Sequence, residues 1–353
     1  MQLESLTATR ASAHKIKIHY KGPIWVLVLL APLIGEVLSG STRLSFLFAF
    51  IPETMVWGCG ALLCRELVRR WRAGATSLLL LGLALSIAEE FVIQQTSLAP
   101  LPFPGAHPLY GRMWGVNWVY FLFMLGYESI WVAVVPVTIA ELTFPARGSQ
   151  PWLRRGGVIT TCVVFLAGCS IAWFAWTQRA RPSLHAAIYH PPFIAVASGL
   201  AAIVLLGYVA YALRGVGGEM AAGNRAVRSS VIPWTAGIAA FAIGCAWFKL
   251  IAMLFTPVHS PAWLPMTMGF AGALCTYALF RALSSRSWSG MERWAASFGA
   301  VMACMSVGYL STAGWKHADL VFKAVVNGLA LIALLALGAV VHRRAARQSQ
   351  EPV

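Results

Sequence analysis

Charged side chains are scarce in this sequence. They make up 11% of the 353 residues, whereas hydrophobic residues make up 59%. Because soluble domains carry about 25% charged residues, this composition excludes a soluble globular protein. The apolar residues instead fall into runs of about twenty residues, the length that an α-helix needs to cross the hydrocarbon core of a membrane.

These runs predict an all-α fold, a polytopic membrane helix bundle of about ten transmembrane helices. They divide the chain into a basic tail (1–23), a single transmembrane domain (24–341) and a second tail (342–353). The first run is expected to remain as an uncleaved helix. The predicted spans are 24–39, 44–64, 75–95, 117–141, 157–177, 193–213, 233–256, 263–280, 294–313 and 320–341.

Motifs for metal binding are missing as well. The sequence contains no CxxC, HxxxH or HExxH segment. All seven cysteines fall within predicted spans, and all eight histidines fall outside them. This distribution indicates no disulfide framework and favours packing roles for the cysteines. We therefore predict no metal site and no cofactor.

Basic residues outnumber acidic ones by 27 to 12, which gives a net charge of +15. In a soluble protein, this excess would indicate a nucleic-acid partner. Here 20 of the basic residues fall in the tails and the even-numbered connections, and only five in the odd-numbered ones. This alternation follows the positive-inside rule and places both termini in the cytoplasm. The predicted partner is therefore the lipid bilayer, and no nucleic acid is expected.

Acidic residues are distributed unevenly between the spans. They occur in or beside the helices of the first part (24–141), whereas the spans of the second part (157–341) contain none. A helical rise of about 1.5 Å per residue places five of them at about 14–20 Å from the inner surface of the membrane. The sequence thus predicts a layer of carboxyl groups in the middle of the bilayer, formed by Glu36, Glu53, Glu89, Glu90 and Glu128.

Such a layer is energetically expensive. Each acid at the centre of a membrane helix costs about 2.5–3.5 kcal/mol, so these groups must be protonated, paired or hydrated. Gln94 follows Glu90 by one helical turn and joins the predicted site. Lys249, at about 24 Å from the inner surface, is the predicted internal counter-ion. Each glutamate also has a structural interpretation, as a hydrogen-bonding partner between helices.

Two segments resemble known families. GALLCRELVRR (60–70) and GLALSIAEEFVIQQ (82–95) resemble an uncharacterised family of bacterial multi-pass membrane proteins, over about residues 30–150. This resemblance implies no known activity. Glu89 and Glu90 also resemble, more distantly, the EExxxR signature of CAAX-protease-like intramembrane hydrolases. In this sequence Gln94 replaces the arginine, and Glu128 stands where a second-motif histidine is expected.

Three hypotheses of function follow. The leading one is that the protein binds and transports a cation or cationic small solute, with proton coupling through the glutamates. The second is an intramembrane hydrolase in which Glu89 or Glu90 is the general base. The third is a non-catalytic subunit whose acids pair with a membrane-protein partner. The expected location is the plasma (inner) membrane of a bacterium.

Overall fold

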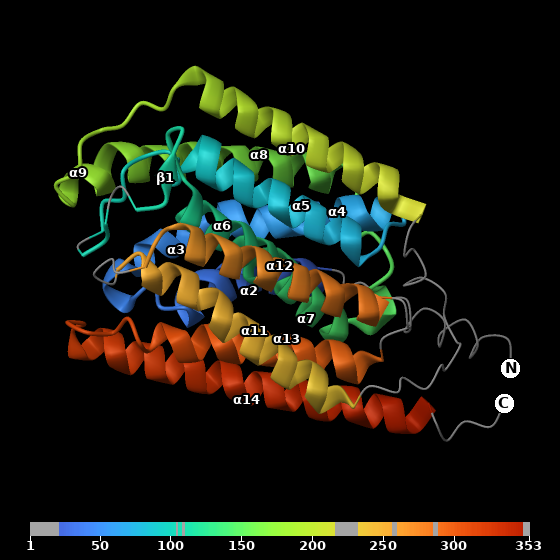
Figure 1. The fold of residues 1–353 in the computed structure, drawn as a ribbon. Helices are drawn as coiled ribbons and strands as arrows, with labels where there is room; N and C mark the ends of the chain where they lie inside the picture. The colour runs from blue at the N-terminus through green and yellow to red at the C-terminus, as the bar shows by residue number, and fades with distance from the viewer. Residues whose placement is uncertain are drawn as a thin grey trace, which may run out of the picture.

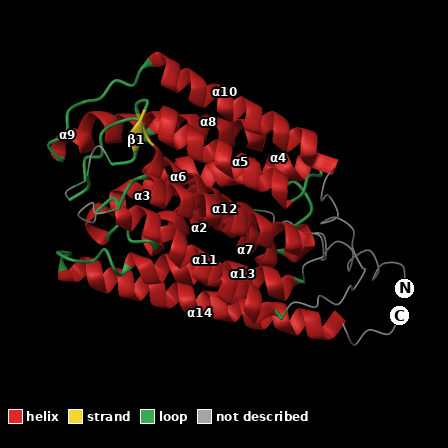
Figure 2. Cartoon of the chain, in the orientation of Figure 1, coloured by secondary structure: helices red, strands yellow, loops and turns green. Residues whose placement is uncertain are grey.

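The computed structural model describes residues 21–103, 105–107, 110–215, 232–255, 260–284 and 289–348. These residues form a bundle of helices stacked side by side (Figure 1). Helix predominates throughout the part of the chain that the structure describes (Figure 2), and its one small sheet pairs β1 (Arg112–Met113) with β2 (Val116–Asn117). The predicted all-α fold is confirmed.

The described residues contain ten helical stretches, one for each predicted span. The first four are α2–η1 (Gly22–Pro32, Leu33–Leu38), η2–α3–η3–α4 (Leu44–Ala49, Phe50–Glu53, Thr54–Gly58, Cys59–Arg70), α5–η4 (Ala75–Ile87, Ala88–Ile93) and α6–η5–α7 (Trp118–Tyr127, Glu128–Val134, Val135–Thr143). A short turn, η6 (Pro145–Arg147), follows. The other six are α8–η7–α9 (Arg155–Phe174, Ala175–Ala180, Arg181–Ser183), α10–η8 (Phe193–Ala212, Leu213–Gly215), α11 (Pro233–Met253), α12 (Trp263–Ser284), α13 (Gly290–Gly308) and α14 (His317–Gln348).

Seven of these stretches are long and apolar enough to cross a membrane. The stretch Gly22–Leu38 is apolar but shorter. The prediction of a multi-pass membrane bundle is therefore confirmed, whereas the passage of each of the ten helices through the membrane and the side on which the termini lie stay predictions. Residues 1–20 of the first tail and 349–353 of the second lie outside the described residues, and α14 extends through 342–348.

The second part of the chain is not free of acids, in contrast to the sequence-based prediction. Helices α13 and α14 begin before their predicted spans, and each includes one acid in its first turn. Glu292 forms a capping box with Ser289 at the start of α13. Asp319 accepts hydrogen bonds from the backbone N–H and the hydroxyl of Ser45. Both acids are buried and hold helix ends in place.

Some helices meet at glycines. Gly58 in η3 lies against the backbone carbonyl of Val28 in α2, and Gly299 in α13 lies against the carbonyl of Gly237 in α11. Neither glycine has room for a Cβ atom. Close approach of backbones at small residues is typical of helix packing in membranes.

A buried ion-pair network holds the segment between α7 and α8. The guanidinium of Arg65 lies 3.0 Å from the Glu141 carboxylate and 3.2 Å from that of Glu66, and it stacks on the Trp152 ring at 3.3 Å. It also donates hydrogen bonds to three backbone carbonyls, of which the closest is that of Gly148 at 2.9 Å. Arg65 is completely buried, so this network lies in the interior and not at the surface.

Candidate functional site

Each of the four helices that carry the predicted acids contains a π-helical turn at or beside its acid. Glu36 lies within η1, Glu89 and Glu90 lie within η4, and Glu128 is the first residue of η5. Glu53 immediately precedes η3. A fifth π-helical turn, η7, contains no acid. π-helical turns are rare and often occur at functional sites. Four of them beside these glutamates therefore make this region of the bundle a candidate functional site.

Prolines accompany three of these turns. Pro32 ends α2 directly before η1, and Pro52 lies in α3 shortly before η3. Pro136 follows η5 as the second residue of α7. A proline cannot donate a backbone hydrogen bond, and its ring displaces the carbonyl four residues earlier. For Pro136 this carbonyl belongs to Val132, within η5. No proline occurs beside η4.

The five carboxyl groups come together inside the bundle. Glu36 interacts electrostatically with Glu53 and Glu89, and Glu89 also interacts with Glu90 and Glu53. Glu128 interacts with Glu89, Glu90 and Glu36. Glu36 is half-buried and the other four are at most 7% exposed. We call these five residues the carboxyl cluster.

Most of the carboxyl cluster lacks partners. Among the residues that the structure describes, none of the five forms an ion pair with Lys, Arg or His. Four buried oxygens have no hydrogen-bond donor, namely one each of Glu53 and Glu89 and both of Glu128. Ser86 lies beside Glu128, yet its hydroxyl makes no hydrogen bond of acceptable geometry. Burial of ionised carboxyls without partners is costly, so these groups require protons, water or a cation.

Two members do have a partner. The hydroxyl of Thr42 donates to one oxygen of Glu53. Glu90 accepts the backbone N–H and the hydroxyl of Ser97 at 2.9 and 2.6 Å. Ser97 is completely buried and begins the segment that leads to the β1–β2 hairpin. This segment therefore packs into the end of the bundle, over η4.

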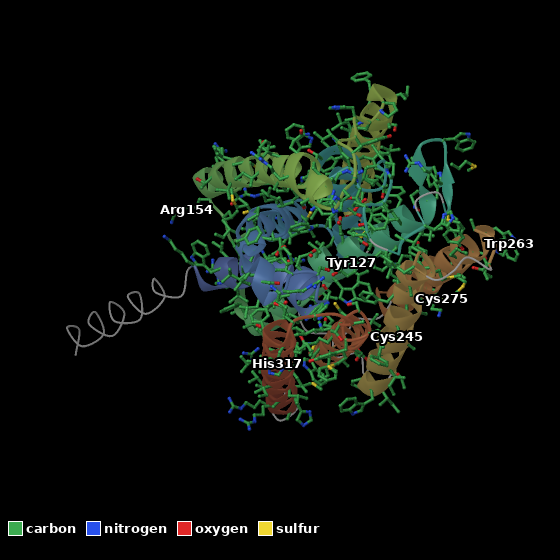
Figure 3. All side chains as sticks on the ribbon, turned by 90° about the vertical axis from the view of Figure 1, so that its left-hand side faces the viewer. Tyr127, Arg154, Cys245, Trp263, Cys275 and His317 are labelled. Atoms are coloured by element: carbon green, nitrogen blue, oxygen red, sulfur yellow. The ribbon has the colours of Figure 1, made fainter. Side chains whose placement is uncertain are left out.

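The structure adds two tyrosines that the sequence analysis did not select. Tyr120, which the sequence favours as a membrane-surface aromatic, is buried and interacts electrostatically with Glu36, Glu89, Glu90 and Glu128. The hydroxyl of Tyr127 donates to the carbonyl of Gly35, next to Glu36. Figure 3, which looks along the bundle, places Tyr127 near the centre and Trp263 and Cys275 towards the rim. The signal for Tyr120 was its position about two helical turns before Glu128.

Lys249 is not the internal counter-ion. Its side chain is exposed on α11, whereas its neighbours Phe248 and Leu250 are buried. The buried lysine is Lys323 of α14, at 2% exposure. It donates to the Leu38 carbonyl at 2.9 Å and lies 4.8 Å from the centre of the Tyr309 ring. The sequence predicts the depth of Lys249 in the membrane, but not the rotation of α11 about its axis, which decides whether the side chain faces inwards.

Gln94 lies at the end of η4, where its backbone N–H donates to the Glu89 carbonyl at 2.8 Å. Its side chain is half-buried, and in the described part of the chain it has no hydrogen bond to any carboxyl of the cluster. The backbone hydrogen bond from Gln94 to Glu89 spans five residues and closes the π-helical turn.

The described residues contain no group of three His, Cys, Asp or Glu side chains arranged to hold a metal ion. No histidine of these ranges pairs with the carboxyl cluster. His259, which follows α11, lies outside the described residues. Within the described ranges, the acids of the carboxyl cluster are therefore grouped without a histidine ion pair.

The chain matches the model of an uncharacterized membrane protein family over residues 25–348. This match confirms the resemblance to an uncharacterised multi-pass family and gives no support to a relationship with CAAX-protease-like hydrolases. Neither a curated protein nor a solved structure matches the chain.

Proposed function

The chain belongs to this uncharacterized membrane protein family, and from its geometry we propose that it binds a cation or a cationic small solute at the carboxyl cluster and transports it in exchange for protons. The proposal is carried by one observation: five carboxyl groups from four helices interact with one another, and no basic side chain of the described residues pairs with them.

The balance of charge in the carboxyl cluster explains why binding of the solute would be coupled to release of protons. Ionised carboxylates in a medium of low dielectric repel one another strongly, so the cluster favours a state in which protons or another cation neutralise it. A proton and a cationic solute compete for the same oxygens. Release of one therefore promotes binding of the other, which is the basis of exchange.

Glu128 is the residue that we assign to direct contact with the solute. Both of its oxygens lack donors, and it interacts with three other members of the cluster. Glu90 is already held by Ser97, so we assign it to the side of the cluster that lies next to Ser97. The widened turn at η5 leaves carbonyl groups without regular α-helical partners, and these can supply further oxygen ligands.

A proteoliposome assay tests this proposal. Vesicles that contain the purified protein and a trapped pH-sensitive dye are exposed to Na⁺, guanidinium or tetramethylammonium. We expect at least one of these cations to move protons in the opposite direction, and Glu128→Gln to abolish this movement. Glu128→Asp keeps the charge and should retain part of the activity.

Glu292→Gln is the matched control. It also neutralises a buried glutamate, but glutamine is accepted at this position of a capping box, so flux should persist. Proton movement no greater than in protein-free vesicles for all three cations contradicts the proposal. A product of hydrolysis lost in Glu90→Gln, or a second membrane protein isolated in fixed ratio, would favour the alternative functions. The location that we propose is the plasma (inner) membrane, whose proton gradient would drive the exchange.

A further inference from the structure

A cavity of about 390 Å³ is lined by Ser129, Ile130 and Trp131 of η5 and by no member of the carboxyl cluster. Its walls come from α5, α6, η5, α11, α12 and one residue of α13. Ile243, which lies midway along α11, and Gly126, near the middle of the α6–α7 stretch, both line it. The cavity is therefore at the depth of the hydrocarbon core.

The cavity surface is apolar. Leucines line it from α5 and α6, and the rings of Trp131 and Trp247 line it from η5 and α11. Both indole N–H groups are already used, since Trp131 donates to the Ala300 carbonyl at 2.7 Å and Trp247 donates to the Phe123 carbonyl at 2.9 Å. The two tryptophans thus present only hydrocarbon to the space between them.

Water is a poor occupant of this cavity. The hydroxyl of Ser129 donates to the Leu125 carbonyl at 2.6 Å, and that of Thr276 donates to the Gly272 carbonyl at 2.8 Å. A buried water needs two to four polar partners, and these walls offer few. An empty cavity of this size would forfeit the dispersion contacts that its walls could make.

The cavity reaches the lipid-facing surface at α12. Tyr277, which lines it, is 49% exposed, and the neighbouring Leu274 is 68% exposed. At this depth, the only medium outside the protein is the acyl chains of the bilayer. The cavity has a volume within the range of ligand sites, its walls are apolar, and it is continuous with the surface. These three properties fit the acyl chain of a lipid.

We propose that this cavity binds an acyl chain of a membrane lipid, which enters beside α12 and packs between Trp131 and Trp247. The bound chain lies against η5, the turn that begins with Glu128. The proposal concerns a second site and does not depend on transport by the carboxyl cluster.

Photolabelling tests the proposal. The protein is placed in nanodiscs of phosphatidylethanolamine and phosphatidylglycerol that contain a phosphatidylethanolamine with a diazirine midway along one acyl chain. After irradiation, labelled peptides are mapped by mass spectrometry. We expect adducts on the cavity walls in 122–130 and 240–247, in addition to adducts on lipid-facing residues such as Val204.

Two substitutions fill the cavity and one does not. Ala240→Phe and Thr276→Phe both place a ring in the space, and labelling of the walls should fall about tenfold as the volume is lost. Ala242→Phe, on the exposed face of the same helix, should leave labelling of the walls unchanged. Val204 should be labelled equally in all variants, and size-exclusion profiles check folding.

Three results overturn the proposal. The first is labelling of Val204 without labelling of the walls in the wild-type protein. The second is labelling of the walls that persists in a folded cavity-filling variant. The third is labelling of the walls by a water-soluble diazirine and not by the lipid, which would show a hydrated cavity.

Discussion

Ser97 donates both its backbone N–H and its hydroxyl to the same carboxyl oxygen of Glu90, at 2.9 and 2.6 Å. This contact fastens the segment before the β1–β2 hairpin to the π-helical turn of α5–η4. Ser97→Ala removes the hydroxyl and should lower the free energy of unfolding by about 1–3 kcal/mol, the usual range for a hydrogen bond to a charged group.

The measurement is equilibrium unfolding of the purified protein in mixed micelles with increasing dodecyl sulfate. Ser198→Ala is the control, because the hydroxyl of Ser198 makes only a local hydrogen bond to the Ala195 carbonyl on an exposed helix face. Equal stability of the Ser97 and Ser198 variants would show that the contact with Glu90 does not hold the segment.

The buried guanidinium of Arg65 should not be replaceable by an ammonium group. Lysine keeps the charge but cannot reach the Glu66 and Glu141 carboxylates, the loop carbonyls and the Trp152 ring together. We expect Arg65→Lys to cost about 2–4 kcal/mol of unfolding free energy, close to the loss of a buried ion pair. Arg155→Lys, at an exposed position, should cost little. A small effect at Arg65 would mean that the network contributes no net stability.

Neutralising two buried glutamates should change stability in opposite directions. Glu128→Gln removes a buried acid whose two oxygens have no hydrogen-bond donor and should stabilise the protein by about 1 kcal/mol, as often occurs when a functional group is removed. Glu141→Gln removes one of the two carboxylates that pair with Arg65 and the carboxylate that pairs with Arg69, and should destabilise the protein by about 3–5 kcal/mol. The same unfolding assay measures both. Destabilisation by Glu128→Gln would indicate a structural role for that residue.

The gain in unfolding free energy that we expect from Glu128→Gln should depend on pH. At neutral pH the substitution removes the cost of a buried acid, whereas at pH near 4 protonation of the wild-type carboxyl removes the same cost. The unfolding free energies of the two proteins should therefore converge as pH falls. We would measure them in parallel from pH 8 to pH 4. A constant difference would show that ionisation of Glu128 does not affect folding.

Lys249→Met should leave both stability and cation-driven proton movement unchanged. The Lys249 side chain is exposed on α11, and exposed substitutions usually change stability by less than about 0.5 kcal/mol. The vesicle assay and the unfolding assay check this expectation. If Lys249→Met lost as much proton movement as Glu128→Gln, Lys249 would have to be part of the transport site.

The sequence predicted the ten helical segments because each is a long apolar run, and the length of a helix that crosses a bilayer is set by the bilayer itself. It also placed Glu36, Glu53, Glu89, Glu90 and Glu128 at similar depths, because depth follows from a constant helical rise. The structure brings these five side chains together, although their role in binding stays a prediction.

The rotation of each helix could not be predicted in the same way. A π-helical turn contains about one residue more than an α-helical turn, so the residues after it are rotated by about 100°. Gln94 closes such a turn with its N–H bond to the Glu89 carbonyl. For Lys249 and Tyr120, the facing direction depends on how neighbouring helices pack, which no single run of residues reveals.

The glycine at position 299 has a consequence for the lipid site. Because Gly299 lies against the Gly237 carbonyl, it sets the spacing between α11 and α13, and Trp247 and Ala300 on these two helices both line the cavity. A methyl group at 299 would push the helices apart and widen the space for a hydrocarbon chain. The thickness of chain that the cavity accepts is thus governed by a contact between two backbones.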